Sequence, residues 1–466
     1  MTTKQIGGGH KIRTFLQTLV WCASFGILFS IFNLLLKSAN DAIKRPETKV
    51  SYVVDRKFLK DYIPGLKRGE LEGKIFHFVQ HTHTDAGWVE TMADYEKIYS
   101  DDTFNTSIQY MNNHTTRQTK LSFTNVEFIR SQILRIPGRL EKFKQLVAEG
   151  KYEMLNGGIV MPDEACNIYD DLLNNYEYGR EYSIELFGEA PRNGWGIDSF
   201  GASACLARLF AEMGYDYFGF MRTPLETKLE MKANRTLVSN WTNRYPEYNI
   251  LTYILMAHYA SPFALLHEFQ FNQHHLLDPK YDGLQRAYDT YWEILSTGQS
   301  YREKNHIVFM GDDFHFRNFS RDIRFYKGVY NMLLANSKSI FKGSQFKVST
   351  VQQAFEAIAS ERLTYDPLAT ADLFPTSHRD YLDQDIYWTG FYFGRIDFKK
   401  DVKEFGETLR GIMHILAFHD LRSKQSTSQA VRAAVSKLRS DEYKTLLEEV
   451  RFTAGILTHH DAITGT

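Results

Sequence analysis

The chain has 466 residues, of which 43% are hydrophobic and 24% are charged, and only 11 are proline. This composition excludes disordered and collagen-like chains and leaves room for about two to four domains. The 55 basic residues balance 56 acidic ones, so we expect no nucleic-acid partner. Cys22, Cys166 and Cys205 are too few for a disulfide framework. Whether Cys166 and Cys205 pair stays open, as does the oligomeric state.

An uncharged apolar segment lies close to the N-terminus, at residues 15–36. At about 1.5 Å per residue it is long enough to cross a hydrocarbon core of about 30 Å. A cleaved signal peptide and a buried core helix are the alternatives, but Lys37 stands where a small residue would precede a cut. We therefore predict a transmembrane signal anchor at 15–36, a cytosolic head at 1–14 and a stem at 37–72.

Five Asn-x-Ser/Thr triplets lie beyond this segment, and they begin at Asn105, Asn113, Asn234, Asn240 and Asn318. Such triplets are glycosylated only in lumenal or extracellular compartments. The charges that flank the apolar segment do not orient it by themselves. With the short basic head, the triplets predict a single-pass type II membrane protein whose bulk lies in the lumen of the Golgi or of another secretory or lysosomal compartment.

Short apolar runs alternate with longer helical patterns from residue 73 onward. This alternation predicts an α/β domain at residues 73–395, with a mainly parallel sheet in a barrel-like arrangement. Residues 396–466 carry long helical patterns without strands, and we predict the start of a three-helix bundle there. The predicted strands are residues 74–80, 120–123, 151–155, 193–197, 215–221, 250–256 and 306–310.

Ionisable residues gather directly after the predicted strands, where parallel sheets place their active sites. His81, His83 and Asp85 follow the first strand at alternate positions. In an extended chain they point to one side, and imidazole and carboxylate groups are suitable zinc ligands. The first strand end is therefore a candidate metal site, with ordinary hydrogen bonding of a polar strand end as the alternative.

A second group, His459, His460 and Asp461, closes the last helical pattern. Neighbours on a helix are about 100° apart, so only one of the two histidines can readily aim at a given metal. A polar helix end is the alternative interpretation.

Carboxylates follow two further strands. Asp198 ends the 193–197 run, and a carboxylate at that place must be hydrogen-bonded, paired or metal-bound. Asp312 and Asp313 follow the 306–310 run and face opposite sides in an extended chain, so at most one of them enters a given pocket. Glycosidases use two such carboxylates, one as the nucleophile and one as the general acid/base. Either carboxylate alone could instead cap a helix.

Three other side chains are candidates for substrate contacts. Arg222, after the 215–221 run, suits an anion or holds a carboxylate in place, with a surface ion pair as the alternative. Trp88 and Phe200 suit stacking on a sugar face, although burial in the core is the default for aromatic residues.

Six segments resemble, in order and approximate spacing, the motifs of the class II α-mannosidases of glycoside hydrolase family 38, the lysosomal and Golgi enzymes. They are HTHTDAGW, NGGIVMPDEA, GWGIDSFG, GDDFHF, YWTGFYFGR and HHDAITGT. The resemblance covers residues 73 to 466 and implies a catalytic domain at 73–395. It implies one zinc ion, and the residues that would hold it are His83, Asp85, Asp198 and His460.

The same resemblance implies Asp198 as the nucleophile and Asp313 as the general acid/base of a retaining α-mannosidase. This enzyme would hydrolyse terminal α-linked mannose of N-glycans. The residues that match substrate-contacting positions are Trp88, Phe200, Arg222, Tyr259, Asp312 and Asp461.

The chain departs from the family pattern at two motifs. Residues 198–202 are Asp-Ser-Phe-Gly-Ala where Asp-Pro-Phe-Gly-His is common, and FGRID replaces the usual Thr-Ser-Arg-Pro run. Family members run to about twice this length, so we expect the chain to be truncated at its C-terminus. A truncated inactive relative that only binds mannose glycans is one alternative, and a metal-dependent deacetylase or phosphoesterase is another.

Overall fold

The structure is a computed structural model, in which the predicted head, signal anchor and stem (1–72) lie outside the described residues. Among the helices that it describes, none is long and apolar enough to cross a membrane. The described residues are 73–97, 101–113, 119–134, 136–242, 248–262, 298–335, 337–338, 343–368, 372–379, 384–425, 428–438 and 440–466.

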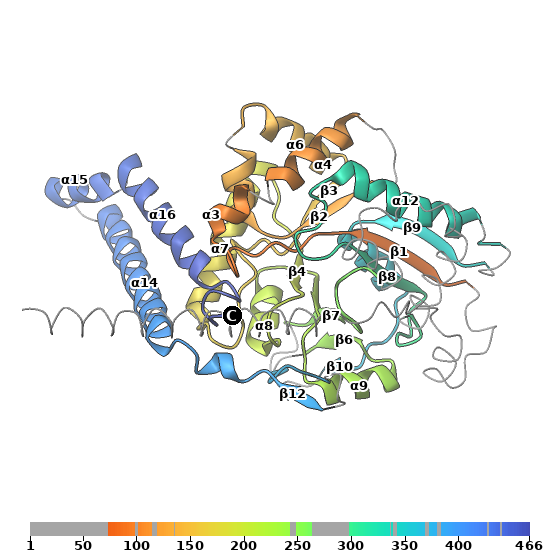
Figure 1. Cartoon of the computed structure of the whole chain (residues 1–466). Coiled ribbons are helices and arrows are strands. Elements are labelled where there is room, and N and C mark those ends of the chain that lie inside the picture. Colours follow the sequence, from red (N-terminus) through yellow and green to blue (C-terminus); the bar gives the residue numbers. More distant parts are fainter. Residues whose placement is uncertain are drawn as a thin grey trace, which may run out of the picture. The chain divides into compact units, whose positions relative to one another are not determined.

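The strands form a mixed, mostly parallel α/β structure (Figure 1). Strand β1 (Ile75–Gln80) lies between β8 (Asn305–Met310) and β9 (Gln345–Ser349), and both pairings are parallel. A five-stranded sheet has the order β10-β6-β7-β5-β4, and β2 pairs with β3. The remaining strands are β2 (Leu121–Phe123), β3 (Tyr152–Met154), β4 (Asn193–Gly196), β5 (Tyr217–Phe220), β6 (Val238–Trp241), β7 (Ile250–Ile254), β10 (Pro367–Leu368), β11 (Ser377–Arg379) and β12 (Asp385–Tyr387).

The described strands form separate sheets, and a closed barrel is not shown among them. Strands β2 and β3 have three residues each. They meet β1 at one isolated bridge, between His81 and Ser122. The link between β1 and the β2–β3 pair is therefore short.

All seven predicted strands are present, within two residues of their predicted bounds. The prediction missed β6 and β9, and also the short strands β10, β11 and β12. Strand β6 is only four residues long and runs antiparallel to β7. In β9, Gln345 and Lys347 face solvent, so its five residues lack the continuous apolar run of a buried parallel strand.

One long helical pattern of the sequence is divided in the structure. The stretch at 126–150 contains α5 (Val126–Phe128), a π-helical turn (Ile129–Ile133) and α6 (Arg139–Ala148). The interruption falls at Pro137 and Gly138, because proline removes a helical hydrogen bond and Gly138 takes a left-handed conformation (φ 75°). The other helices are α3 (Met92–Tyr95), α4 (Asp101–Asn113), α7 (Tyr169–Phe187), α8 (Ala204–Glu212), α9 (Leu225–Asn234), α12 (Phe319–Ala335), α13 (Val351–Ala359), α14 (Ile396–Gln425), α15 (Gln429–Leu438) and α16 (Asp441–Leu457).

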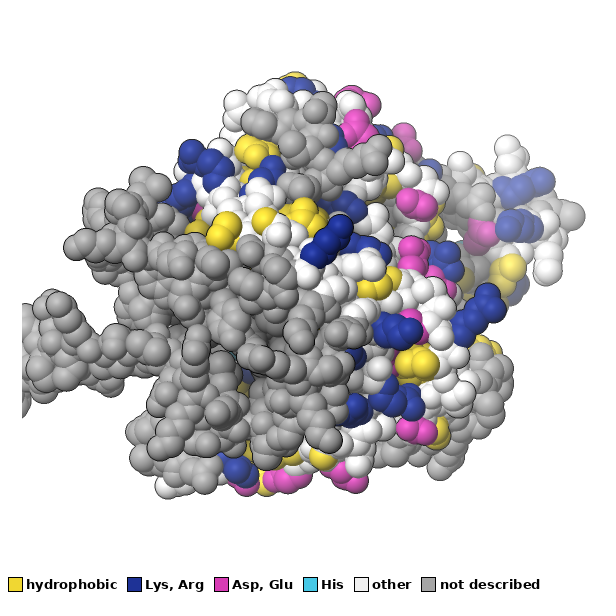
Figure 2. Space-filling view, turned by 90° about the vertical axis from the view of Figure 1, so that its right-hand side faces the viewer, with side chains coloured by type: hydrophobic (Ala, Val, Ile, Leu, Met, Phe, Trp, Pro, Cys, Tyr) yellow, Lys and Arg dark blue, Asp and Glu magenta, His cyan; other side chains and the backbone are white. Residues whose placement is uncertain are grey.

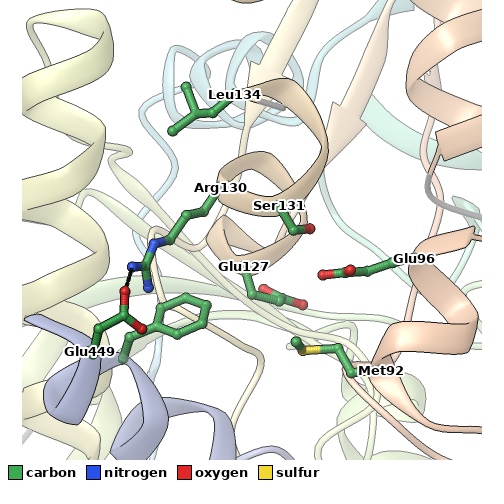
Figure 3. A pocket seen from close by; sticks show the side chains of 8 residues that line it. Met92, Glu96, Glu127, Arg130, Ser131, Leu134 and Glu449 are labelled. Atoms are coloured by element: carbon green, nitrogen blue, oxygen red, sulfur yellow. Dashed lines mark hydrogen bonds and ion pairs between the residues drawn. The ribbon is translucent and has the colours of Figure 1, made fainter. Parts of the chain in front are cut away.

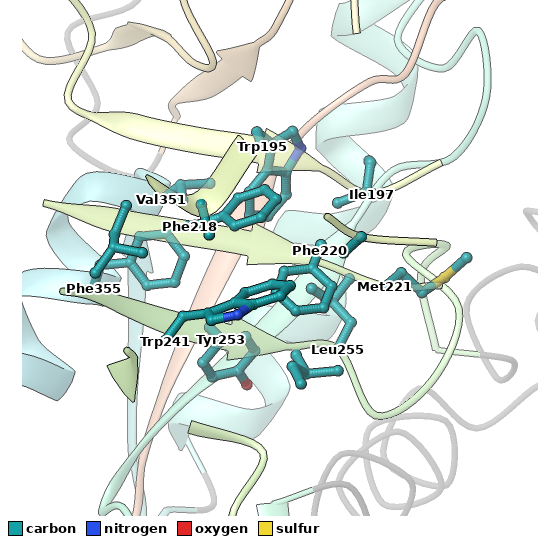
Figure 4. Close-up of a cluster of buried hydrophobic side chains, with 14 of the residues drawn as sticks. Trp195, Ile197, Phe218, Phe220, Met221, Trp241, Tyr253, Leu255, Val351 and Phe355 are labelled. Carbon is teal, nitrogen blue, oxygen red and sulfur yellow. The ribbon is translucent and has the colours of Figure 1, made fainter. Parts of the chain in front are cut away.

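An aromatic core supports the five-stranded sheet (Figure 4). Trp195 of β4 and Trp241 of β6 are fully buried. Phe218 of β5 lies parallel to Trp241, with ring centroids 6.3 Å apart. Such rings contribute much of the buried apolar area of a core. This packing fixes the carboxyl ends of β4 and β5, after which Asp198 and Arg222 follow.

The predicted helical segment is present as α14, α15 and α16 (Figure 1). Helix α16 packs along α7, where Arg451 pairs with Glu177 and Glu181. Beyond α16 the chain returns to the sheets, because the backbone of Asp163 donates to the carbonyl of Thr458 at 3.0 Å. The C-terminal motif is thereby placed against the strand ends.

Figure 2 shows one face of the molecule, on which the described Lys and Arg side chains alternate with Asp and Glu. Positive and negative groups are interspersed over the described part of that face. This agrees with the balanced net charge of the sequence. Cys166 and Cys205 are both free thiols.

Candidate active site

Four buried side chains from distant parts of the chain converge at the carboxyl ends of β1 and β4. His83 and Asp85 follow β1, Asp198 follows β4, and His460 follows α16. One nitrogen or oxygen atom of each lies within 4.8 Å of the corresponding atom of the others. The structure thus brings together the four residues that the resemblance implied as zinc ligands.

The two imidazoles present their Nε2 atoms to the carboxylates. His83 Nε2 is 2.9 Å from Asp85 Oδ1 and 3.7 Å from Asp198 Oδ2. His460 Nε2 is 3.3 Å from Asp85 Oδ1 and 3.4 Å from Asp198 Oδ2. The other nitrogen of His460, Nδ1, is 2.8 Å from the carbonyl oxygen of Met161. A proton on Nδ1 donated to that carbonyl leaves the lone pair of Nε2 free for a metal.

The donor set fits zinc. Among the described residues, His83 Nε2, His460 Nε2 and Asp85 Oδ1 are buried without a partner in hydrogen-bond geometry. Buried polar atoms in that state are costly unless a shared ligand satisfies them. Two imidazoles and two carboxylates form a typical four-coordinate zinc set. Burial lowers the pKa of His83, but the surrounding carboxylates, Asp85 first and then Asp198 and Asp313, together outweigh burial and raise the pKa to about 9, which indicates that the site attracts positive charge.

Two further histidines, His81 and His459, lie beside the four-residue cluster. His459 belongs to a second candidate metal-binding group with Asp85, His460 and Asp461. His81 lies with Nε2 2.8 Å from the carbonyl oxygen of Tyr259, so it is a neighbour of the cluster. His459 is buried, with Nε2 3.5 Å from Asp85 Oδ1. The expected helical divergence of His459 and His460 does not apply, because α16 ends at Leu457 and both follow in a turn.

Asp198 is held from two sides. Its Oδ1 accepts hydrogen bonds from Nε of Arg222, at 2.9 Å, and from Nη2. The Arg222 guanidinium lies 4.5 Å from the ring centre of Trp388 and 5.5 Å from that of Phe200. Burial alone would raise the pKa of Asp198, but the adjacent imidazole of His460 and the charge of Arg222 together hold it well below its usual range. Asp198 is therefore ionised at neutral pH.

Asp313 has a different environment. It is exposed to solvent at the end of β8, and its Oδ1 accepts a hydrogen bond from the hydroxyl of Tyr259 at 2.7 Å. The removal of water from its surroundings raises its pKa to about 6, against the opposing charge of His83. Asp312 turns back to accept from the backbone N–H of Asp313 at 2.9 Å. The two carboxylates therefore have different hydrogen-bond partners.

The remaining predicted substrate contacts fall into two groups. Trp88 is 50% exposed and lines, with Asp461, a cavity of about 610 Å³. Its face is thus open to a ligand. Phe200 is only 3% exposed and packs edge-on against His460, with ring centroids 5.7 Å apart. Phe200 therefore packs against a residue of the cluster and has little exposed surface for contact with a sugar.

The loop that carries Asp198 shows how the chain accommodates its departure from the family pattern. The Ser199 hydroxyl donates to the carbonyl of Pro162 at 2.7 Å, and Pro162 forms a bridge with His459. Gly201 has φ 117°, and an added Cβ would lie 2.2 Å from the ring of Phe374. Ser199 thus ties the Asp198 loop to the segment that meets the C-terminal motif.

Sequence reasoning assigned no role to Trp388. The signal for Trp388 was present, because the residue belongs to the quoted YWTGFYFGR segment. In the structure, its indole N–H donates to His378 Nδ1 at 2.8 Å while its ring lies against Arg222. No local pattern indicates this contact between residues 166 positions apart.

Comparisons with known proteins agree with this geometry. The sequence profile of the glycosyl hydrolases family 38 N-terminal domain matches residues 74–379. A lysosomal alpha-mannosidase of Dictyostelium discoideum is 29% identical over 417 residues, which are 84% of this chain and 38% of that protein. Alpha-mannosidase 2 of Mus musculus is 26% identical over 425 residues, 83% of this chain and 35% of that protein.

A solved structure shares the fold. The crystal structure of an alpha-mannosidase from Enterococcus faecalis V583 superposes with a TM-score of 0.60 at 13% sequence identity. The superposition covers 84% of this chain and 39% of that one. The chain thus spans less than two fifths of the length of these relatives.

Proposed function

Because the chain belongs to glycosyl hydrolase family 38, we propose that it is a zinc-dependent, retaining α-mannosidase acting on terminal α-linked mannose of N-glycans. The observation that carries this proposal is the convergence of His83, Asp85, Asp198 and His460 in one buried cluster. Asp313 and Asp198 supply the two carboxylates that glycoside hydrolysis needs. This set of reactive groups favours an enzyme over an inactive relative that only binds glycans.

The side chains divide the chemistry between them. Asp198, ionised and oriented by Arg222, attacks the anomeric carbon of mannose. Asp313, protonated below its pKa of about 6, protonates the leaving oxygen and then takes a proton from the water that releases the sugar. Two displacements at the same carbon retain the configuration.

His83, Asp85, Asp198 and His460 would hold the zinc ion. When bound, zinc would supply a Lewis acid and a template for the vicinal hydroxyls of mannose. Trp88 presents an open aromatic face for the sugar ring.

Removal of the metal tests the proposal. The full chain is treated with a chelator, dialysed, and assayed on an aryl α-mannoside before and after the addition of zinc. We expect activity to be lost on chelation and to return with zinc, and mannose to appear first as the α-anomer in an NMR time course. Full activity in the metal-free protein would contradict the zinc assignment, and first appearance of the β-anomer would contradict the roles of Asp198 and Asp313.

We also propose that the anchor at residues 15–36 places the described domain in the lumen of the secretory pathway. Four of the five sequon asparagines are exposed, namely Asn105, Asn113, Asn234 and Asn318. Asn240 is half-buried within β6, between β10 and β7.

A glycosidase digest checks this placement. The protein expressed in eukaryotic cells should lose mass on treatment with peptide N-glycosidase, because the exposed asparagines are open to the glycosylation machinery. Replacement of Asn240 by Gln should leave the mass unchanged, whereas replacement of Asn318 by Gln should remove one glycan. A protein of unmodified mass would contradict the lumenal placement.

A further inference from the structure

A second group of acidic side chains lies outside the site described above. Glu127 of α5 and Glu96, directly after α3, line a cavity of about 450 Å³. Figure 3 shows their carboxylates directed toward one another across this cavity, with Ser131 on the same side. The proposed mannosidase mechanism uses neither residue.

Glu127 is the unusual member of this group. Its side chain is fully buried, and among the described residues no donor reaches either carboxylate oxygen in hydrogen-bond geometry. Its polar neighbours are the side chain of Asn125 and its own backbone N–H. Buried carboxylates are ordinarily paired, hydrogen-bonded or bound to a metal.

The nearby cation does not satisfy Glu127. Arg130 lines the same cavity, but its guanidinium pairs with Glu449 and lies 4.2 Å from the ring centre of Phe452. In Figure 3 this pair points away from Glu96 and Glu127. Three carboxylates and one guanidinium therefore line the cavity.

We propose that Glu96 and Glu127 form a second metal site, distinct from the zinc cluster, that binds one hard divalent cation of the calcium or magnesium class. Two carboxylates, the Ser131 hydroxyl and retained water supply the all-oxygen coordination that these ions prefer. Imidazole and thiolate groups, which favour zinc, are absent from the described lining of this cavity.

The surroundings indicate what the cation does. Met92, Arg130 and Phe452 bring three segments of the chain to this cavity: α3, the π-helical turn and α16. Helix α16 leads to His460. A cation at Glu96 and Glu127 therefore stabilises the wall against which α16 packs and contributes chiefly to stability.

Titration of the full, zinc-saturated chain tests the second site. Calcium chloride and magnesium chloride are added separately, with heat of binding and melting temperature as readouts. We expect one ion of at least one kind to bind per chain and to raise the melting temperature, because a ligand that binds only the folded state stabilises it. Glu127→Gln and Glu96→Gln should each weaken binding at least tenfold. Glu141→Gln, which removes an exposed carboxylate from α6, should bind as the natural chain does.

The two glutamine variants and the natural chain together decide whether the second metal site exists. Glutamine has nearly the shape of a protonated glutamate, so both variants should fold, and their melting without added cation checks this. The proposal is overturned if the natural chain takes up neither ion at about 10 mM, roughly ten times the weakest affinities of extracellular calcium modules. It is also overturned if both variants bind with unchanged affinity. Zinc dependence of mannoside hydrolysis is measured separately, so failure of this site leaves that test unaffected.

Discussion

Asp198 and Asp313 stand in contrasting environments at the two sides of the candidate site. Arg222 and His460 hold the pKa of Asp198 well below its usual range, although burial opposes this. Loss of water from around its carboxylate raises the pKa of Asp313 to about 6. Environments that separate the pKa values of two carboxylates assign one as the nucleophile and the other as the acid. Activity that needs protonated Asp313 should therefore decline as the pH rises through about 6.

Replacement of Tyr259 by Phe tests this assignment. The Tyr259 hydroxyl donates to Asp313 and so favours its ionised form. Without the hydroxyl, the pKa of Asp313 should rise, and the basic limb of the pH–activity profile should move up by about one pH unit. We expect kcat at neutral pH to change by less than about tenfold in the same variant.

A control variant separates this effect from general perturbation. Tyr330 donates to the carbonyl of Phe346, away from the site, so Tyr330→Phe should leave the profile where it is. An unshifted profile in Tyr259→Phe would show that Tyr259 does not tune Asp313.

At the scale of elements, the close approach of two chain segments past the ends of β1 and β8 sets the position of Asp313. Gly311 has φ 148°, and an added Cβ would lie 1.8 Å from the carbonyl oxygen of His81. The backbone of Phe314 also donates to the carbonyl of His83 at 2.7 Å. The two segments thus bring the acid/base candidate next to a metal-ligand candidate.

Replacement of Gly311 by Ala should force these segments apart. We expect a loss of about 2–4 kcal/mol in the free energy of unfolding, since the clash is with backbone. Gly328→Ala in α12 is the matched control, because an added Cβ there meets nothing within 4 Å. That variant should gain about 0.5–1 kcal/mol through helix propensity. Urea unfolding of both variants measures the difference in the free energy of unfolding. Equal stability of the two variants would show that the close approach of the segments after β1 and β8 does not require Gly311.

At the scale of the whole molecule, the C-terminal helix delivers a metal-ligand candidate to the sheets. An added Cβ at Gly455 of α16 would lie 2.2 Å from Cδ1 of Ile159. Arg451 holds the same helix to α7 through Glu177 and Glu181. The position of His460 therefore depends on the close packing of α16 against the loop after β3.

Gly455→Val should displace α16 and weaken zinc binding. Overpacking of this kind costs about 1–3 kcal/mol, which corresponds to roughly ten- to hundredfold lower affinity. Competition with a chromogenic chelator measures it. Thr453→Val, at an exposed position of the same helix, should bind zinc normally. Unchanged affinity in Gly455→Val would show that His460 holds its place without this contact.

The strands and the chemistry at their ends were predictable from the sequence because both depend on local patterns. An apolar run followed by a polar motif predicted β1 with His83 and Asp85, and β4 with Asp198. Strand β9, with Gln345 and Lys347 facing solvent, has no such pattern. Whether the sheets close into a barrel could not be derived from such patterns, because the order of strands depends on pairings between distant segments.

The sequence by itself determined the family, the mainly parallel α/β class and the residue types available at each strand end. Only the tertiary structure decided that His460 meets Asp85 and Asp198, that Trp388 lies on Arg222, and that Glu127 is buried without a hydrogen-bond partner among the described residues. The physical reason is that periodicity and motif spacing report neighbours within one element. Contacts across hundreds of residues exist only when packing brings separate elements to one place.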